Sequence, residues 1–150
     1  MKRLLSFVLP LLILTSCTPN SNSSSTSTKK ESDMKLSIDN QELDVAWEDN
    51  DSVKALKGML PLTISMHEYG GFEQTGSIGQ SIVRNDSQID VVPGDIVLYS
   101  GNAISVFYST SSWSYTRLGH INLNKNELND LLNKESVTFV LKGEKVWKKY

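Results

Sequence analysis

The sequence DIVLYSGNAISVFYS, residues 95–109, contains two apolar runs separated by the polar break SGN. Residues 95–99 and 103–109 each have the length of a strand, and a short break that contains glycine is typical of a hairpin turn. The preceding VPGD has proline where a turn fixes φ and glycine where φ must be positive. This stretch therefore predicts an antiparallel β-hairpin that is entered through a tight turn.

Shorter alternating runs on both sides of this hairpin predict further strands. Apolar and polar residues alternate over 34–38 and 43–47 around a turn at Asn40-Gln41, and alternate again over 62–67 and 137–141. Further strands are expected around Ile82-Val83, over 115–123 and around Val146-Trp147, whereas GGFEQTGSIG (70–79) is expected to be a glycine-rich loop.

Two short segments have helical spacing instead. Val53, Leu56 and Leu60 predict a helix that is capped by Asp49, Asn50 or Asp51 and ends at Pro61. Residues 124–127 (NKNE) resemble a capping box and open a second helix with an apolar stripe at Leu128, Leu131 and Leu132.

About eight short strands and two short helices define the expected fold class. Antiparallel alternation with hairpin turns favours a mainly β, closed eight-stranded barrel, because closure removes the edge strands that would otherwise aggregate. The helices would plug or cover the ends of the barrel. The sequence contains no repeat of the length that solenoids and propellers need.

The N-terminus has the pattern of an exported protein. Lys2 and Arg3 precede the apolar run LLSFVLPLLIL (4–14), which suits a signal peptide and is too short for a membrane-spanning helix. Next comes Leu-Thr-Ser-Cys, whose Cys17 is the single cysteine of the chain. This string resembles the lipobox of bacterial lipoproteins, so we expect cleavage after residue 16 and lipidation of Cys17. The alternative is an uncleaved anchor, or an ordinary signal peptide with a chance cysteine.

The residues after Cys17 form a tether in this interpretation. The tract TPNSNSSSTSTKKESD lacks large apolar residues, so it cannot bury enough surface to offset its ordering entropy and should be disordered. As a flexible coil it would span about 20–24 Å. The expected organisation is a signal peptide at 1–16, the lipidated cysteine and tether at 17–33, and a folded domain at 34–150 outside the cytoplasm.

Composition limits the partners of this domain. The net charge is −2, and loss of Lys2 and Arg3 would make the mature chain more acidic, so we expect no nucleic-acid partner. The lysines at 142, 145, 148 and 149 form one basic patch, which is read as a solvated end or as a weak attraction to anionic lipid. One thiol excludes an intrachain disulfide. We expect a monomer that contacts the membrane through its lipid.

Motifs for catalysis, metals and phosphates are missing. Gly71-x-x-x-x-Gly76 is followed by Ser77 rather than the lysine of a P-loop, and no Gly-x-Ser-x-Gly motif is present. His67 and His120 are far apart, and paired metal ligands at short spacing are absent, so no metal and no cofactor are expected. His67 is expected to be solvated, and His120 either exposed or half-buried.

One group of residues suggests a binding site. Aromatic side chains with polar groups gather before the glycine-rich stretch and around the serine-rich segment 109–114, which is how shallow peptide or ligand pockets are built. Packing of the core and loops explains the same residues, since Phe107 and Tyr108 must face opposite sides and one of them is inside. The candidate ligand-binding residues are Met66, Tyr69, Phe72, Glu73, Phe107 and Tyr115.

Several short motifs together resemble the bacterial cyclophilin-like domain family. They are Trp47-x-Asp49-Asn50, Leu56, Leu60-Pro61-x-Thr63-x-x-Met66, Gly71-x-Glu73, Pro93-Gly94-Asp95-Ile96-x-x-Tyr99, Phe107-Tyr108 and Leu118-Gly119-x-Ile121. The resemblance runs from about residue 34 to residue 121 and implies an eight-stranded barrel with two helices. It leaves the activity open, because the activity of this family is mostly undefined.

The resemblance also raises the question of prolyl isomerisation. True cyclophilins use an arginine beside a Phe-x-x-Gln-Gly-Gly segment, and that segment is absent here. After the leader the chain has only Arg84 and Arg117, for which solvent-facing roles are the simpler explanation. Family members often have lysine where this chain has Gln74, which weakens a charge-pair role for Glu73.

Three hypotheses follow from the sequence. The first is a lipid-anchored extracytoplasmic module that binds a peptide or small ligand and has no catalytic residue. The second is a peptidyl-prolyl cis-trans isomerase. The third is a structural envelope module that presents its loops to a partner protein.

Overall fold

The computed structural model describes residues 34–144, which form ten strands and two helices. In chain order they are β1 (Met34–Ile38), β2 (Gln41–Leu43), β3 (Val45–Trp47), α1 (Asp51–Lys57), β4 (Leu62–Tyr69), β5 (Glu73–Ser77), β6 (Ser87–Val91), β7 (Asp95–Tyr99), β8 (Ala103–Phe107), β9 (Ser111–Ile121), α2 (Lys125–Leu132) and β10 (Ser136–Gly143). The leader, the tether and the expected strand at Val146-Trp147 lie outside the described residues. Within 34–144, no helix has the length and apolar character needed to cross a membrane.

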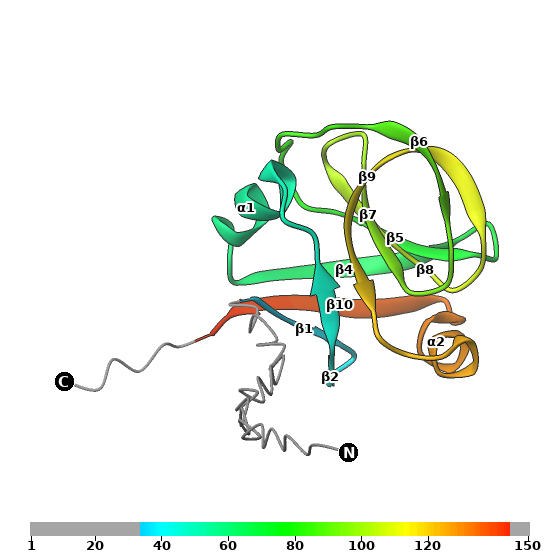
Figure 1. The fold of residues 1–150 in the computed structure, drawn as a ribbon. Coiled ribbons are helices and arrows are strands. Elements are labelled where there is room, and N and C mark those ends of the chain that lie inside the picture. The colour runs from blue at the N-terminus through cyan, green and yellow to red at the C-terminus, as the bar shows by residue number, and fades with distance from the viewer. Residues whose placement is uncertain (1–33, 145–150) are drawn as a thin grey trace, which may run out of the picture. The chain divides into compact units, whose positions relative to one another are not determined.

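The strands form an antiparallel ring in the order β2-β1-β10-β4-β5-β8-β7-β9-β3, as Figure 1 shows. One continuous segment, residues 41–47, closes this ring, because its first half (β2) pairs with β1 and its second half (β3) pairs with β9. The chain bends between the halves at Asp44, whose carbonyl accepts a hydrogen bond from Asn122 N at 2.9 Å. With β2 and β3 counted as one segment, the ring contains eight strands, so the predicted barrel is confirmed.

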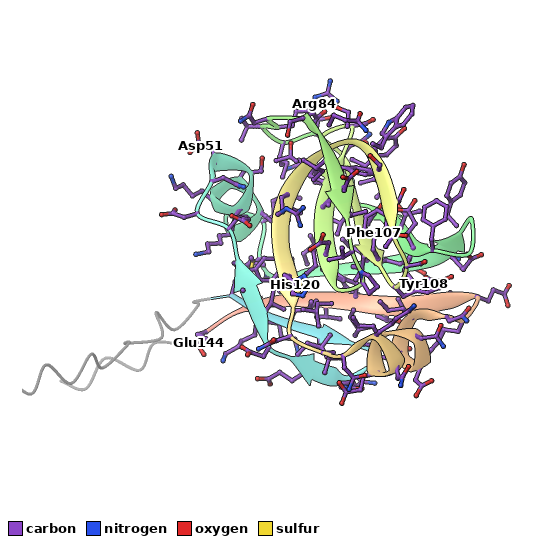
Figure 2. All side chains as sticks on the ribbon, turned by 45° about the vertical axis from the view of Figure 1, so that its right-hand side comes forward. Asp51, Arg84, Phe107, Tyr108, His120 and Glu144 are labelled. Carbon is purple, nitrogen blue, oxygen red and sulfur yellow. The ribbon has the colours of Figure 1, made fainter. Side chains whose placement is uncertain are left out.

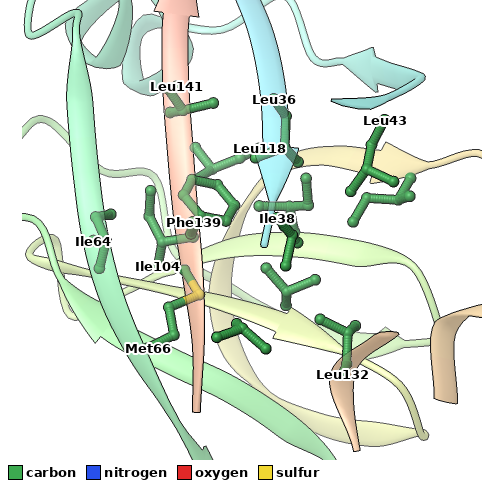
Figure 3. Packing of buried hydrophobic residues seen from close by; sticks show 14 of the residues in the cluster. Leu36, Ile38, Leu43, Ile64, Met66, Ile104, Leu118, Leu132, Phe139 and Leu141 are labelled. Atoms are coloured by element: carbon green, nitrogen blue, oxygen red, sulfur yellow. The ribbon is translucent and has the colours of Figure 1, made fainter. Parts of the chain in front are cut away.

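The barrel interior is filled by alternate residues of every strand in the ring. Ile96 and Leu98 of β7 and Ile104 and Val106 of β8 are fully buried there. Figure 3 shows side chains from β1, β4 and β10 meeting at the centre, with Leu132 of α2 beside them. Each large side chain buried in this way contributes about 1.5–3 kcal/mol to folding. Leu128, Leu131 and Leu132 of α2 belong to the same core, so the leucine stripe that the sequence predicts packs α2 against the barrel.

The central hairpin is confirmed, and the first hairpin differs by one residue. β7 and β8 pair in register from Ile96↔Val106 to Tyr99↔Ala103. Between β1 and β2 the turn is at Asp39-Asn40, where φ is +48° and +68°, and not at Asn40-Gln41 as predicted. A two-residue turn with both φ values positive fits the twist of a hairpin, and Asp and Asn tolerate that conformation.

The stretch 70–79 was expected to be a loop, but it contains β5. Its strand conformation comes from partners that are distant in sequence, since β5 pairs with both β4 and β8. Gly76 is needed there because a Cβ atom would lie 2.5 Å from Ile64 Cγ2 and 2.9 Å from Ser65 O. The prediction of a continuous loop was therefore wrong.

The strand expected at Ile82-Val83 is also wrong. Ile82 N donates to Gly101 O at 2.8 Å, and Val83 O accepts from Ser52 Oγ at 2.6 Å, so these backbone groups bind a turn and a helix. The strand in this region is β6, which pairs with the first half of β9.

Both predicted helices are present, and their N-terminal caps are as expected. Asn50 caps α1 by accepting from Val53 N at 2.9 Å, and Asn124 and Glu127 form a capping box at α2. α1 ends at Lys57, four residues before Pro61, and the Gly58 N–H donates to Lys54 O and Ala55 O in its last turn.

Candidate functional site

A second, smaller apolar cluster lies on the outer face of the barrel wall. Because strand residues alternate, Val97 and Phe107 point away from the barrel core in which their neighbours lie. They pack with Val91 and Tyr115, which come from β6 and the first half of β9. Figure 1 shows β9 arching over this part of the barrel. The arch and the wall together create a site outside the main core.

A cavity of about 500 Å³ opens beside this cluster. Its size is within the range of small-molecule sites. Five of its lining residues are aromatic, and three of those, Tyr69, Tyr99 and Trp113, are 63%, 42% and 58% exposed. Exposed aromatic groups gathered in one place mark an interaction site better than single exposed residues do. The lining is Tyr69, Phe72, Glu73, Thr75, Tyr99, Ser111, Ser112, Trp113 and Tyr115.

The aromatic rings form a connected series. Phe72 lies parallel to Phe107 with ring centroids 6.3 Å apart, and it meets Tyr69 edge-on at 6.2 Å. Phe107 meets Tyr115 at 5.6 Å, and Tyr115 meets Tyr99 at 6.1 Å. Four of the five aromatic residues that line the cavity are thus linked in one series through Phe107.

Glu73 is the acidic residue at the base of the cavity. Its side chain is on the same face of the sheet as Phe107, because the two residues are opposite each other in the β5–β8 register. The residue is 7% exposed, and its Oε2 atom has no hydrogen-bond partner. Burial raises the pKa of this carboxyl above its ordinary value, and a polar contact with Ser105 offsets part of the rise.

Neighbouring hydroxyl groups complete the base. Ser105 Oγ donates to Thr75 Oγ1 at 3.0 Å, and Ser112 Oγ accepts from Gln88 Nε2 at 3.0 Å. Burial also raises the pKa of the Tyr115 hydroxyl, and the charges of Glu73 and Tyr99 add to this rise while a hydrogen bond with Ser111 opposes it. The cavity is thus acidic at its base and aromatic along its walls.

The residues that the sequence proposes for ligand binding fall into three places. Tyr69, Phe72, Glu73 and Tyr115 line the cavity. Phe107 is fully buried behind Phe72 and Tyr115 and supports them. Met66 is fully buried in the main core, as Figure 3 shows, and is not among the residues that line the cavity.

Phe107 and Tyr108 face opposite sides, as the sequence predicts, but both are buried. Tyr108 enters the main core and its hydroxyl donates to Glu68 Oε1 at 3.2 Å. Trp113 belongs to the aromatic group that the sequence indicates around residues 109–114, but it was not among the candidate ligand-binding residues. Tyr99 was not placed at the site, because it reaches the site only through the pairing of β7 with β8 and β9.

Gln74 is not part of the cavity. It follows Glu73 on β5 and therefore points to the opposite face, where it is fully buried. Its Nε2 donates to Leu132 O at 2.8 Å and to Lys134 O at 2.5 Å, beyond the end of α2. The residue that replaces the lysine of the family pattern thus attaches a helix to the barrel.

A buried charge network that sequence analysis missed lies where β7 pairs with β9. Asp95 is 2% exposed and contacts Arg117 Nη1 at 2.6 Å, His120 Nδ1 at 2.8 Å and Val92 N at 3.0 Å. Burial alone would raise the pKa of Asp95, but the bonds from His120, Val92 and Arg117 outweigh it and lower the pKa. The network stabilises the VPGD turn. His67, by contrast, is exposed as expected.

A second cavity, of about 570 Å³, has a different character. Arg84 and Arg117 both line it, together with acidic residues around the start of α1. Arg84 pairs with Asp86 at 3.5 Å, and Arg117 pairs with Asp95. Its lining contains no aromatic residue. In residues 34–144 no three His, Cys, Asp or Glu side chains are grouped to hold a metal ion.

Comparison with known proteins agrees with the barrel fold. A model of the cyclophilin-like family matches residues 36–142, which is most of the described part of the chain. The chain belongs to the cyclophilin-like family. The cyclophilin-like domain is also similar to the solution structure of a hypothetical protein from Archaeoglobus fulgidus, with a TM-score of 0.54 and 17% identity over 74% of this chain and 93% of that chain. This likeness concerns the fold alone. No match was found among curated proteins.

The cyclophilin-like domain does not bring its arginines to its aromatic cavity. Neither Arg84 nor Arg117 lines that cavity. Figure 2 shows Arg84 at the top of the molecule and Phe107 well below it. Both arginines line the second cavity instead.

Proposed function

We propose that this protein is an exported lipoprotein, anchored to a bacterial membrane through Cys17, whose cyclophilin-like domain binds a peptide or small ligand. The domain faces away from the cytoplasm, acts as a monomer and catalyses no reaction. One observation carries the binding function: an aromatic cavity on the outer face of the barrel contains a buried carboxylate oxygen without a partner. Leaving a buried acceptor without a partner costs about 1–3 kcal/mol. Gln74 Oε1 is in the same state inside the barrel, but Glu73 Oε2 belongs to a residue that lines a cavity, where a ligand can satisfy it.

The anchor is tested on the native protein. Mass spectrometry of the chain from the membrane fraction should find residues 1–16 removed and a lipid on Cys17, and Cys17→Ser should release the domain from the membrane. A full-length chain with an unmodified thiol in the cytoplasm would contradict this part of the proposal.

The binding function is tested by NMR titration of the full-length protein in maltoside micelles with a fragment and peptide library. A ligand should shift the resonances of Phe72, Phe107 and Tyr115 and leave those of residues in the second cavity, such as Asn85, unchanged. The absence of shifts at these positions with every compound would contradict the proposal.

Prolyl isomerisation is the alternative function, and the separation of the arginines from the aromatic cavity weighs against it. Uncatalysed isomerisation takes tens of seconds, so catalysis is easily detected in a coupled peptide assay. We expect no acceleration. Acceleration that Arg84→Ala or Arg117→Ala abolishes would establish the enzyme in place of the binding module.

A further inference from the structure

The cavity lacks any positive group of its own. Its lining comprises five aromatic residues, of which three are tyrosines, three serine or threonine residues and Glu73, and none of these described residues is a lysine, arginine or histidine. Arg117 lines the other cavity, where it forms an ion pair with Asp95 and donates a hydrogen bond to Asp90 O at 3.2 Å. The charge of Glu73 is therefore not balanced within the site.

An unbalanced, buried carboxylate can be satisfied by a ligand in two ways. A neutral carboxyl would donate a proton to an acceptor on the ligand, whereas an ionised carboxylate would pair with a cation. The base of the cavity is acidic in either case. Whether a hydrogen-bond acceptor or a cation is the favoured ligand group depends on the aromatic residues that line the walls.

The walls favour a cation. The faces of aromatic rings carry partial negative charge, so they attract cations and repel the oxygen atoms of carbonyl and carboxylate groups. Tyr69, Tyr99 and Trp113 line the cavity and are each more than two-fifths exposed, so a ligand in the cavity can contact their rings. Figure 2 shows Phe107, which supports this aromatic series, beside the arch of β9.

The hydroxyl groups indicate the type of cation. A primary ammonium is best held by three acceptors, but five of the nine lining residues are aromatic, and Thr75 Oγ1 and Ser112 Oγ each already use one of their two lone pairs, for Ser105 and Gln88. A methylated ammonium has no such need, because its methyl groups contact ring faces and its charge is spread over them. A phosphate next to the cation would find no positive partner among the lining residues.

From this arrangement, and resting on the proposed binding function, we propose that the aromatic cavity binds the methylated ammonium group of a small, unphosphorylated organic cation. Glu73 supplies the counter-charge at the base, and Tyr69, Tyr99, Trp113 and Tyr115 supply the ring faces around it.

The test is calorimetric titration of the full-length protein in maltoside micelles at pH 7.5. Choline should bind at least about tenfold more tightly than 3,3-dimethylbutan-1-ol, which has the same shape without the charge. Phosphocholine and ethanolamine should both bind more weakly than choline. Equal affinity for choline and its neutral analogue would overturn the proposal, and so would ethanolamine or phosphocholine binding as tightly as choline.

Two variants locate the effect. Glu73→Gln should weaken choline binding at least about tenfold and leave binding of the neutral analogue nearly unchanged. Glu42→Gln is the matched control, because it removes the same charge from an exposed position on β2. Trp113→Leu, at an exposed residue that can change without unfolding the domain, keeps apolar area but removes the ring face. It should weaken choline binding more than binding of the analogue, and full choline affinity in both Glu73→Gln and Trp113→Leu would overturn the assignment.

The outcome also separates this proposal from the proposed function. If library compounds shift Phe72 and Tyr115 but choline does not bind, the cation assignment is overturned and the binding module stands. If no compound of any kind produces shifts at these residues, both are overturned.

Discussion

Glu73 stands directly opposite Phe107 in the antiparallel register of β5 and β8. Paired residues of antiparallel strands project to the same face, so a carboxylate and an aromatic ring share the outer side of the barrel wall. This pairing explains both the raised pKa of Glu73 and the position of the carboxyl at the base of an aromatic cavity. It also implies that the ionised carboxylate of Glu73 lowers the stability of the fold, because burial disfavours its charged form.

This effect of burial predicts a stabilising substitution. A carboxyl whose pKa is higher in the folded than in the unfolded chain binds more protons when folded, so stability falls as pH rises from the ordinary glutamate pKa through the raised one. Glu73→Gln should therefore raise the unfolding midpoint at pH 7, by a few degrees as an order of magnitude, and flatten the decline above pH 4.5. Thermal unfolding followed by circular dichroism over pH 4–8 measures this. A lower midpoint at pH 7 would show that the carboxylate stabilises the fold.

Asp95 should behave in the opposite way. Asp95→Asn removes the charge that Arg117 and His120 contact and weakens the cap on Val92 N. Because the side chains of Arg117 and His120 are 34% and 44% exposed and water can solvate them, the expected loss is about 1–3 kcal/mol. Because its folded pKa is lowered, Asp95 contributes stability above the ordinary aspartate pKa, and the contribution is lost as pH falls through the lowered value. Urea unfolding at pH 7 and at pH 3 measures both effects. Asp90→Asn is the control, since Arg117 contacts the backbone of that residue, and an equal loss in both variants would contradict the network.

Gly76→Ala tests the close approach of β5 to β4. The added Cβ would lie 2.5 Å from Ile64 Cγ2 and 2.9 Å from the backbone oxygen of Ser65, so a strand must shift, at a cost of about 1–3 kcal/mol. Chemical denaturation gives the value. A change in the free energy of unfolding below about 0.5 kcal/mol would show that the two strands separate easily.

Gln74→Met tests the attachment of α2 independently of the cavity. The change keeps side-chain volume but leaves the carbonyls of Leu132 and Lys134 without their donor, which should cost about 1–3 kcal/mol. Hydrogen exchange should show faster opening of α2. Because Gln74 is on the inner face of β5, any ligand that binds the aromatic cavity should bind this variant unchanged, and a joint loss of affinity would place the residue in the site after all.

Local signals were sufficient for much of the fold. The β7–β8 hairpin, the capping box at Asn124 and the alternation of β10 are each encoded within a few residues, and each was predicted correctly. β5 was missed because EQTGS has low strand propensity and becomes a strand only through pairing on both sides.

The site was predictable in part for the same reason. Tyr69, Phe72 and Glu73 are close in sequence, so their composition alone draws attention. Asp95, Arg117 and His120 meet only because β7 pairs with β9, and a bulge between Ile96 and Val97 shifts the register there. Sequence spacing alone does not predict that these three side chains are in contact.

The single sheet wall between the barrel core and the outer cluster has an evolutionary consequence. The two sides hold separate apolar clusters, so the effects on folding of substitutions at well-separated positions on the two sides should be nearly additive. The outer rings at Tyr69, Tyr99 and Trp113 are thus free to diversify, and the molecule can acquire new binding preferences while its barrel remains intact. Glu73 is the exception, because ligand binding favours the carboxylate at this position whereas stability of the fold favours a neutral side chain.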